Sequence, residues 1–391
     1  MVTQQEKKMN FELSKNTLKY LEDSADETLE LLEALCKIPA PSHHEDKRAE
    51  FCKKWLEENG AEGVAIDSAK NVVFPLECEG KDDIVVFMAH TDTVFPDLTE
   101  PMPYFRDDKR VYSPAVGDDT VCVAMMLMVI KYVVKNSLTS PHGILFVANS
   151  CEEGLGNLKG VKQIMSDYAG RISRLYTFDG RYHEIICKCV GSHRYKVSIE
   201  TEGGHSFANF GNRNAIFVMS ELIYRLNQCQ IPYEKDSKTT YNVGIIEGGT
   251  SVNTIAQNAS FLYEYRSDSH ICLEKMKKFF EKEIELARTD DKATITVDII
   301  GVRPCSNAVD ESTLEEMIQK TQEICKKHTG IDCVRASGST DANIPMSLGV
   351  PAVCVGTYQG GGMHTREEYL EISSIPAGLK IAAELILGYF S

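Results

Sequence analysis

Hydrophobic positions in the first half of the chain alternate between helical and strand-like spacing. Leu29, Leu32 and Cys36 fall on one helix face, which predicts an amphipathic helix over 25–37. A second helix is expected from about 44 to 59, because Gly60 is a typical residue to follow a helix. Further helices are expected over 119–136 and 158–168, and strands near 63–67, 71–77, 83–89, 143–149 and 174–178. Strands that alternate with helices predict a mixed, mostly parallel sheet with helices on both faces.

The pattern changes after about Gly191. Residues 194–201 alternate like a strand with one exposed face. The elements expected next are a helix over 212–227, strands over 241–247 and 258–266, a helix over 271–288 and a strand over 293–300. This β-α-β-β-α-β order is the ferredoxin-like arrangement. The α/β pattern resumes at Pro304, with helices over 311–328 and 374–389 and strands near 332–335 and 351–355. We therefore expect an α/β domain formed by 1–190 and 304–391, interrupted by an inserted α+β domain over 191–303.

Composition narrows the choice of partners and compartment. The chain has 391 residues, 43% of them hydrophobic, and a net charge of −15, so it can form two domains with real cores. The acidic balance disfavours nucleic acids and anionic membranes. No apolar run approaches the roughly eighteen residues of a membrane span. The segment Met1–Lys8 is polar and lacks the apolar stretch of a signal peptide. With thirteen cysteines and no export signal, we expect reduced, buried thiols and a cytoplasmic protein.

Two short polar segments follow strand-like runs and suggest a metal site. His90–Thr93 ends the apolar run Ile84–Ala89, and Glu152-Glu153 comes shortly after the run Ile144–Ala148. In an open α/β sheet, ligands gather at the carboxyl ends of the strands. Three further candidates occupy loops or strand ends, namely Asp118-Asp119, Asp179 and His364. Histidines combined with carboxylates suit a divalent metal with nitrogen and oxygen ligands, which predicts metal-assisted hydrolysis.

The spacing within each segment adds chemical detail. His90 and Asp92 are two residues apart, so on a strand they share a face. Asp92 can then accept a hydrogen bond from the second ring nitrogen of His90 when the first binds a metal. At a strand end, one of Glu152 and Glu153 can bind metal while the other reaches the metal-bound water. A carboxylate beside that water is the natural general base.

Five stretches, taken in order, resemble one enzyme family over the chain from about residue 25 to the end. They are Ala89–Val94, Gly117–Asp119, Glu152–Gly156, Phe178–Gly180 and Met363-His364. The chain resembles the dinuclear zinc exopeptidases, a family that includes peptidase T (tripeptide aminopeptidase), carboxypeptidase G, acetylornithine deacetylase and succinyl-diaminopimelate desuccinylase. Each stretch alone is a weak signal, whereas the ordered set is specific. The resemblance implies a zinc exopeptidase type of α/β fold with the inserted ferredoxin-like domain acting as a lid.

The resemblance also implies a role for each residue of the set. Two divalent ions are expected, most often Zn²⁺, with Co²⁺ or Mn²⁺ as replacements. Glu152 would be the general base, Asp92 would orient His90, and the peptide bond after Asp118 would be cis. Thr120 and Cys122 stand where members often carry Lys and Gly, which bears on local packing and substrate preference. The ligands implied are His90, Asp118 and Asp179 for one ion, and Asp118, Glu153 and His364 for the other, with Asp118 bridging.

The inserted domain carries residues that the resemblance assigns to substrate. In Gly203–Ser206 the two glycines favour a turn, and the resemblance makes His205 the donor that stabilises the oxyanion. Asn253 and Arg266 would contact substrate, Arg266 through a bidentate bond to a carboxylate. An ion pair inside the domain explains Arg266 equally well. Gly338 begins a segment that resembles the family's glycine-rich loop near the substrate, and that also reads as a plain turn.

The implied reaction is hydrolysis of the amide bond of short peptides. The runs Glu152–Asn157 and Gly248–Asn253 look most like the peptidase T branch, an aminopeptidase for tripeptides. Hydrolysis of N-acyl amino acids and carboxypeptidase activity use the same site, so fold and ligands do not separate these activities. A non-catalytic peptide-binding protein on this scaffold is a third reading, which the loss of Glu152 or a ligand would favour. A homodimer through the inserted domain is also expected from the resemblance.

Overall fold

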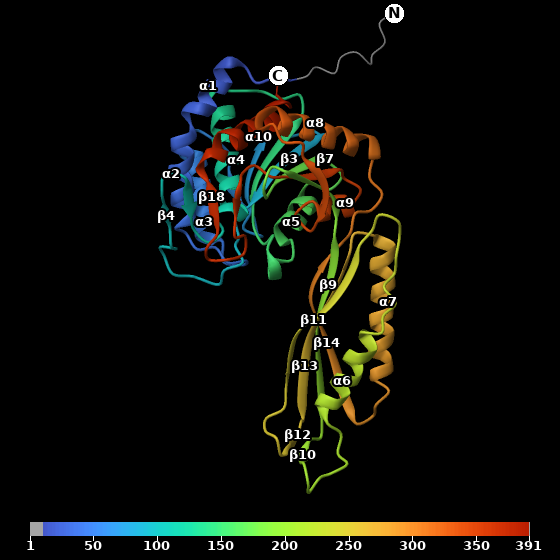
Figure 1. The fold of residues 1–391 in the computed structure, drawn as a ribbon. Coiled ribbons are helices and arrows are strands. Elements are labelled where there is room, and N and C mark those ends of the chain that lie inside the picture. Colours follow the sequence, from blue (N-terminus) through green and yellow to red (C-terminus); the bar gives the residue numbers. More distant parts are fainter. Residues whose placement is uncertain (1–10, 391) are drawn as a thin grey trace, which may run out of the picture. The chain divides into compact units, whose positions relative to one another are not determined.

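The protein divides into two compact units. The computed structural model describes residues 11–390 apart from the side chain of Leu155, so the predicted absence of a signal peptide in Met1–Lys8 concerns residues outside the described part. Unit 1 comprises Met1–Cys187, Val309–Ala336 and Thr340–Ser391, and unit 2 comprises Lys188–Ala308 and Ser337–Ser339 (Figure 1). These limits lie close to the expected boundaries, except that the short segment Ser337–Ser339 joins unit 2.

The central sheet has eight strands in the order β1-β2-β6-β3-β7-β16-β8-β15. Neighbours among β6, β3, β7 and β16 are parallel, while β2 and β8 pair antiparallel to their neighbours β6 and β16. The mixed, mostly parallel sheet predicted from the sequence is therefore confirmed. The strands are β1 (Ala65–Ile66), β2 (Val72–Leu76), β3 (Ile84–His90), β6 (Gly143–Asn149), β7 (Ile172–Phe178), β8 (Glu184–Cys189), β15 (Val334–Gly338) and β16 (Ala352–Val355).

Both faces of this sheet are covered. Every residue of β3 and of β6 is buried, as expected for parallel strands with layers on each side. One face of β3 carries Val85, Phe87 and Ala89, which share a core with α4 (Val121–Lys135) and α10 (Ile375–Leu387). Successive side chains on a strand point to opposite faces. The neighbouring residues of β3 therefore point away from that core, yet they are buried too.

The other helices of unit 1 fall close to their predicted positions, with two exceptions. One is α1 (Lys15–Asp23), which begins after the side-chain cap Ser14 and buries only Thr17 and Leu21. The other is α9 (Asn343–Ser347), whose five residues are too few to show a helical period. The remaining helices are α2 (Ala25–Cys36), α3 (Asp46–Glu58), α5 (Lys159–Asp167) and α8 (Glu311–Thr329).

A small antiparallel sheet in unit 1 has no counterpart in the sequence expectations. Its order is β17-β18-β5-β4, and its strands are β17 (Gly360–Gly361), β18 (Tyr369–Glu371), β5 (Arg110–Tyr112) and β4 (Phe105–Arg106). Strands of two or three residues are too short to show alternation. Pairing of β18 with β5 brings together segments about 250 residues apart. The chain between β17 and β18 carries His364, and the chain after β5 leads to Asp118.

Unit 2 has the predicted β-α-β-β-α-β order. Its sheet order is β11-β13-β9-β14, and all neighbours are antiparallel. The helices α6 and α7 pack on β9 and β13 around a core separate from that of unit 1 (Figure 1). The elements are β9 (Gly191–Thr201), α6 (Ala215–Leu226), β11 (Thr239–Gly248), β13 (Asn258–Ser267), α7 (His270–Ala287) and β14 (Ala293–Arg303). The short strands β10 (Gly204–His205) and β12 (Thr254–Ile255) pair with each other.

Two further observations bear on the environment of the chain. Among residues 11–390, no helix is at once long enough and apolar enough to cross a bilayer. All thirteen cysteines are unpaired thiols, and only Cys187 and Cys229 among them are more than marginally exposed. The expected buried, reduced cysteines are thus present.

Gly378 provides a test of the packing beneath the sheet. A Cβ at this position would overlap the carbonyl oxygen of Thr357 and lie 2.8 Å from Sδ of Met125. Glycine in a helix interior is usually less stable than alanine by roughly 0.5–1 kcal/mol. Here overpacking should reverse the sign, so Gly378→Ala is expected to lower the free energy of unfolding by about 1–3 kcal/mol in a urea titration. A gain in stability would show that α10 has room to move away from Thr357.

Candidate metal centre

Five of the predicted site residues meet at the carboxyl end of the central sheet. His90 is the last residue of β3, and Asp179 directly follows β7. Ligand atoms of His90, Asp118 and Asp179 lie within 4.8 Å of one another. Those of Asp118, Glu153 and His364 form a second group with the same property. Strand ends and the β17–β18 connection therefore bring distant segments to one place.

Asp118 belongs to both groups because its two oxygens face different histidines. Its Oδ1 lies 3.1 Å from Nε2 of His90, and its Oδ2 lies 2.9 Å from Nε2 of His364. The same nitrogen of His364 is 3.3 Å from Oε1 of Glu153. A carboxylate placed in this way can bridge two ions. The peptide bond from Asp118 to Asp119 is cis, as the resemblance implies.

Crowded carboxylates dominate the electrostatics of this place. Burial and the charge of Asp118 raise the pKa of Glu153 to about 7, and the same causes raise the pKa of Asp179 well above its ordinary value. Burial acts on Asp118 in the same sense, but hydrogen bonds with His364 and His90 hold its pKa below the usual range. Hydrogen bonds with Asp118 and Glu153 raise the pKa of His364 to about 10. Such a cluster demands positive charge, which bound dications supply.

The donor set fits a pair of divalent cations. Each group offers one imidazole nitrogen and two carboxylates, which are ligands that zinc accepts and that cobalt and manganese share. Oε1 of Glu153 is buried and faces Nε2 of His364 at 3.3 Å, as two ligands of one ion would. Three protein ligands for each ion leave a coordination position for water, as in catalytic zinc sites.

Asp92 holds the segment that carries both glutamates. Its carboxylate accepts hydrogen bonds from the backbone N–H groups of Glu152 at 2.8 Å and Glu153 at 2.9 Å, and from the hydroxyl of Ser42 at 2.6 Å. The ring of His90 contacts both the backbone and the carboxylate of Asp92. Its Nδ1 lies 3.1 Å from the carbonyl oxygen of Asp92 and 3.5 Å from the carboxylate. The single contact expected between Asp92 and His90 is therefore a small part of what Asp92 does.

A second acidic group lies near Glu152. Asp341, in the predicted glycine-rich loop, is buried and accepts a hydrogen bond of 2.7 Å from Nδ2 of Asn149, the last residue of β6. Burial and the charge of Glu152 raise the pKa of Asp341 to about 8. Glu152 itself is buried, and the bond from its backbone N–H to Asp92 places it. The candidate base thus lies in a strongly acidic, largely dry environment.

Thr120 and Cys122, the two departures from the family pattern, both have structural partners. Thr120 accepts a hydrogen bond of 3.3 Å from Arg48, a buried guanidinium that also bonds the carbonyl oxygen of Thr91 at 2.9 Å. The thiol of Cys122 accepts a hydrogen bond of 3.1 Å from Thr357. Neither residue contributes a ligand atom to the two groups. The departures therefore alter packing beside the centre and leave its ligands intact.

Two of the substrate residues predicted in unit 2 lie side by side. Ser206 donates its backbone N–H to the carbonyl oxygen of Asn253 at 3.0 Å, which joins the loop after β10 to the loop before β12. The side chain of His205 is exposed, and its Nδ1 accepts a backbone hydrogen bond of 3.3 Å from Phe207. With Nδ1 acting as acceptor, Nε2 carries the ring proton and can donate it to a ligand.

Arg266 and Gly338 do not join this pair. Arg266 lies near the opposite end of β13, roughly 25 Å away at the usual rise per strand residue. Its guanidinium binds the carboxylate of Glu264 in a bidentate fork, at 3.0 and 3.1 Å. The ion pair within the domain, one of the two readings for Arg266, is thus present. The carbonyl oxygen of Gly338 accepts a hydrogen bond of 2.7 Å from Val190.

Comparison with known proteins agrees with this centre. Residues 86–388 match the family described as Peptidase family M20/M25/M40, and this range contains all five candidate ligands. The chain belongs to this family. It is therefore a metallopeptidase, as predicted. Carboxypeptidase G2 from Pseudomonas sp. (strain RS-16) is 23% identical over 326 residues, which cover 81% of this chain and 76% of that protein.

Two solved structures show the same fold. A tripeptidase from Staphylococcus aureus subsp. aureus Mu50 has a TM-score of 0.75 at 21% identity, covering 93% of this chain and 97% of that one. The aminopeptidase PepT from Bacillus cereus ATCC 10987 has a TM-score of 0.69 at 21% identity, covering 93% of this chain and 98% of that one. At such identities the likeness establishes the fold of this M20/M25/M40 peptidase and leaves its substrate open.

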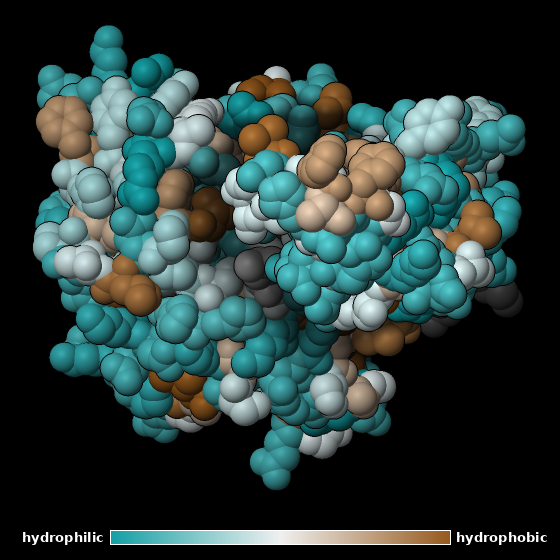
Figure 2. All heavy atoms as spheres, turned by 90° about the horizontal axis from the view of Figure 1, so that it is seen from below, coloured by the Kyte–Doolittle hydropathy of each residue, from teal (hydrophilic) through white to brown (hydrophobic). Residues whose placement is uncertain are grey.

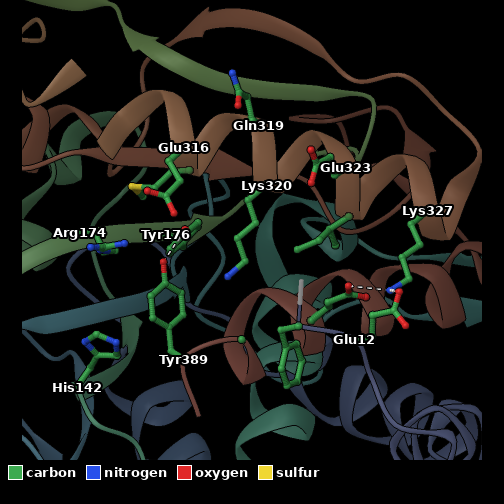
Figure 3. Close-up of a pocket in the computed structure, with 15 residues that line it drawn as sticks. Glu12, His142, Arg174, Tyr176, Glu316, Gln319, Lys320, Glu323, Lys327 and Tyr389 are labelled. Atoms are coloured by element: carbon green, nitrogen blue, oxygen red, sulfur yellow. Dashed lines mark hydrogen bonds and ion pairs between the residues drawn. The ribbon is translucent and has the colours of Figure 1, made fainter. Parts of the chain in front are cut away.

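A cavity of about 480 Å³ lies at the other end of the sheet in this M20/M25/M40 peptidase (Figure 3). Arg174, near the start of β7, lines it together with Lys320, whose ammonium lies 4.7 Å from the ring centroid of Tyr389. Glu384 of α10 binds Lys327 of α8 at 2.9 Å on the same wall. None of the candidate ligands lines this cavity, so it is separate from the metal centre.

Sequence reasoning missed several residues that support the ligands of this peptidase. Each bonds to a ligand-bearing segment or to a residue that does, and all but the half-buried Ser42 are buried. They are Ser42, Arg48, Asn149, Asp341 and Glu368. The only available hint concerned Asp341, which occurs inside a stretch that resembles the family.

Asp92 is expected to stabilise the fold through the three hydrogen bonds that its carboxylate accepts. Asp92→Asn keeps the shape but turns an amide NH₂ toward groups that themselves donate. We expect the free energy of unfolding of the metal-free protein to fall by about 1–3 kcal/mol in urea, the usual cost of an unsatisfied buried donor. Ser42→Ala removes one hydrogen bond and should cost about 1 kcal/mol or less. Equal, small losses in the two variants would show that Asp92 does not hold the Glu152–Glu153 segment.

Proposed function

We propose that this protein is an aminopeptidase that removes the N-terminal residue of short peptides, tripeptides above all, with two divalent ions, Zn²⁺ in the first place. The observation that carries the proposal is the pair of three-ligand groups that share Asp118. The likeness in fold to a tripeptidase and to PepT supports the choice of substrate. Glu152, buried beside the two groups, acts as the general base.

In this proposal each side chain has one task. His90 and Asp179 would hold one ion, Glu153 and His364 the other, and Asp118 both. When bound, the ions would polarise the scissile carbonyl group and lower the pKa of a water molecule. Glu152 accepts a proton from the attacking water and returns it to the amine that leaves.

Unit 2 supplies the remaining groups in this proposal, acting as a lid. His205 would donate its Nε2 proton to the oxyanion of the tetrahedral intermediate. Asn253, which lies beside His205, would contact the substrate backbone. Gly338 would belong to the glycine-rich loop that lies next to the substrate. Arg266 would bind a substrate carboxylate, for which it must exchange its present partner Glu264. The lid role rests on the family resemblance and on the exposed position of His205.

A substrate panel on the zinc-loaded protein tests the proposal. Tripeptides with a free amino group should be cleaved even as C-terminal amides, because an aminopeptidase recognises the N-terminus. The amides should react more slowly, because they lack the carboxylate that Arg266 would bind. N-acetylated tripeptides should resist. Glu152→Gln should bind the same amount of zinc but lose at least about a hundredfold in kcat, as general-base removal does. Activity of this variant close to wild type, at equal metal content, would place the base elsewhere.

A carboxypeptidase or an N-acyl amino acid hydrolase is the second candidate. Similarity to carboxypeptidase G2 along most of the chain favours it. The same panel separates the two functions, since a carboxypeptidase cleaves N-acetylated tripeptides and rejects C-terminal amides. A protein that retains two ions and cleaves no member of the panel would instead agree with a peptide-binding role.

We also propose that the protein works in the cytoplasm. All thirteen cysteines are unpaired thiols. Unpaired thiols in this number are typical of a reducing compartment.

A homodimer through unit 2 forms the last part of the proposal. Phe217 and Tyr224 on α6 and Ile246 on β11 are exposed, and a groove between α6 and β11 is lined mainly by apolar side chains. In Figure 2, apolar side chains interrupt a mainly hydrophilic surface. β11 is an edge strand with unpaired backbone groups, and such strands need cover. A two-fold interface would cover this edge and the apolar groove together.

Charge placed on this edge should dissociate the dimer. Ile246 is 57% exposed on β11, and Ile299 is 68% exposed on β14, the opposite edge of the same sheet. We expect Ile246→Lys to sediment as a monomer in analytical ultracentrifugation, while wild type and the matched control Ile299→Lys sediment as dimers. A wild-type monomer at micromolar concentration would contradict the dimer. Dissociation by Ile299→Lys alone would move the interface to β14.

A further inference from the structure

Glu368 joins two of the candidate ligands through the backbone. Its Oε1 accepts hydrogen bonds from the N–H groups of Gly117 and Asp118, both at 2.9 Å. Its Oε2 accepts a third, from Ala115, also at 2.9 Å. The residue is 1% exposed and follows His364 by four positions. One side chain thus connects the loop of His364 to the segment that presents Asp118.

The segment it holds has no regular structure to hold it otherwise. Pairing of β5 with β18 ends at Tyr112, and the last backbone bond from this side runs from Ser113 to the carbonyl oxygen of Glu368 at 3.2 Å. Beyond it, Ala115 adopts a left-handed conformation with φ of 58°, and Asp118 has non-helical dihedral angles inside an irregular turn. A buried N–H that loses its acceptor destabilises the folded chain. Three such groups depend on Glu368 alone.

The other side of the segment leaves no room for adjustment. A Cβ on Gly117 would overlap the hydroxyl group of Tyr358. The backbone is therefore enclosed between Tyr358 and the carboxylate of Glu368. Among the described residues, no lysine, arginine or histidine forms an ion pair with Glu368. Its two oxygens are held by backbone N–H groups.

We propose that Glu368 is a positioning residue for metal binding, which sets the carboxylate of Asp118 against the imidazole of His364. The inference rests on the proposed dinuclear centre and adds a residue that touches neither ion. Glu368 fixes the backbone of Asp118 with its side chain, and its own backbone belongs to the connection that carries His364. Loss of the carboxylate should therefore weaken the ion held by Asp118, Glu153 and His364 more than its neighbour.

The test compares Glu368→Gln with wild type by zinc affinity. Glutamine has the same shape, but its NH₂ group cannot accept the bond that one carboxylate oxygen now receives. Metal-free, full-length protein is titrated with zinc in competition with a chromophoric chelator of known affinity. We expect one of two zinc ions to bind at least about tenfold more weakly, the usual effect of losing a residue that orients a ligand. Glu368→Asp, which keeps both acceptor oxygens on a side chain one methylene shorter, serves if the glutamine variant does not fold.

Glu384→Gln is the matched control. Glu384 is a glutamate that is 4% exposed and joins α10 to α8 through Lys327, on the wall of the cavity in Figure 3. Its replacement should lower the melting temperature and leave both zinc affinities unchanged. Amide hydrogen exchange at 115–118 in metal-free protein gives a second readout. It should rise in Glu368→Gln and stay at the wild-type rate in the control.

The outcomes distinguish a failure of the proposed dinuclear centre from a failure of the proposed role of Glu368. Wild-type protein that binds fewer than two zinc ions contradicts the proposed function, and the metal role of Glu368 with it. Wild type that binds two ions, combined with wild-type affinities in Glu368→Gln, overturns the role of Glu368 alone. Equal loss of affinity in Glu384→Gln overturns it too, because general loss of stability would then explain the effect.

Discussion

Repulsion among crowded carboxylates is the constraint on which the functional end of this protein depends. Asp118, Glu153 and Asp179 are crowded at the carboxyl end of the sheet, and the charge of Asp118 raises the pKa of both neighbours. Hydrogen bonds to His90 and His364 offset part of the repulsion. A fold that keeps these groups together forgoes stability unless cations join them. The arrangement is intelligible as a site for two dications in a metallopeptidase of family M20/M25/M40.

Two further carboxylates keep this crowded set in place by binding backbone. Asp92 accepts from the amides of Glu152 and Glu153, and Glu368 accepts from the amides of Gly117 and Asp118. Both act on the loops between regular elements, where ligand-bearing backbone would otherwise lack acceptors. The sheet brings the ligand-bearing segments together, and the carboxylates of Asp92 and Glu368 fix the orientation of their backbone. Precise placement of this kind is what a metal site needs from the residues behind its ligands.

The candidate ligands were predictable from the sequence, whereas the residues that support them were not, for a physical reason. His90 and Asp179 end strands whose apolar runs are long enough to recognise, and the resemblance placed Asp118, Glu153 and His364 around them. The sheet of unit 2 was equally predictable from the sequence, because strands of about ten residues with one polar face show a clear alternation. The small sheet that delivers His364 has strands of two or three residues, which carry no period.

Hydrogen bonds between a side chain and distant backbone groups produce no recognisable pattern in the sequence. Glu368 acts on residues 250 positions away, and nothing in its neighbourhood distinguishes it from Glu367. Arg266 shows that one residue type allows two partners. Its guanidinium suits a substrate carboxylate or an ion pair within the domain equally well, and the chain itself provides the carboxylate of Glu264 two positions earlier. A motif indicates which chemistry is possible, and the partners decide which of those possibilities is in use.

The most direct test of the account is the position of metal in a crystal of the wild-type protein grown with zinc. Anomalous scattering at the zinc edge should show two peaks roughly 3.5–4 Å apart, the spacing of two-metal sites. One peak should lie between His90 and Asp179, the other between Glu153 and His364, and both should contact Asp118. A single peak, or two peaks that do not share Asp118, would contradict the dinuclear centre.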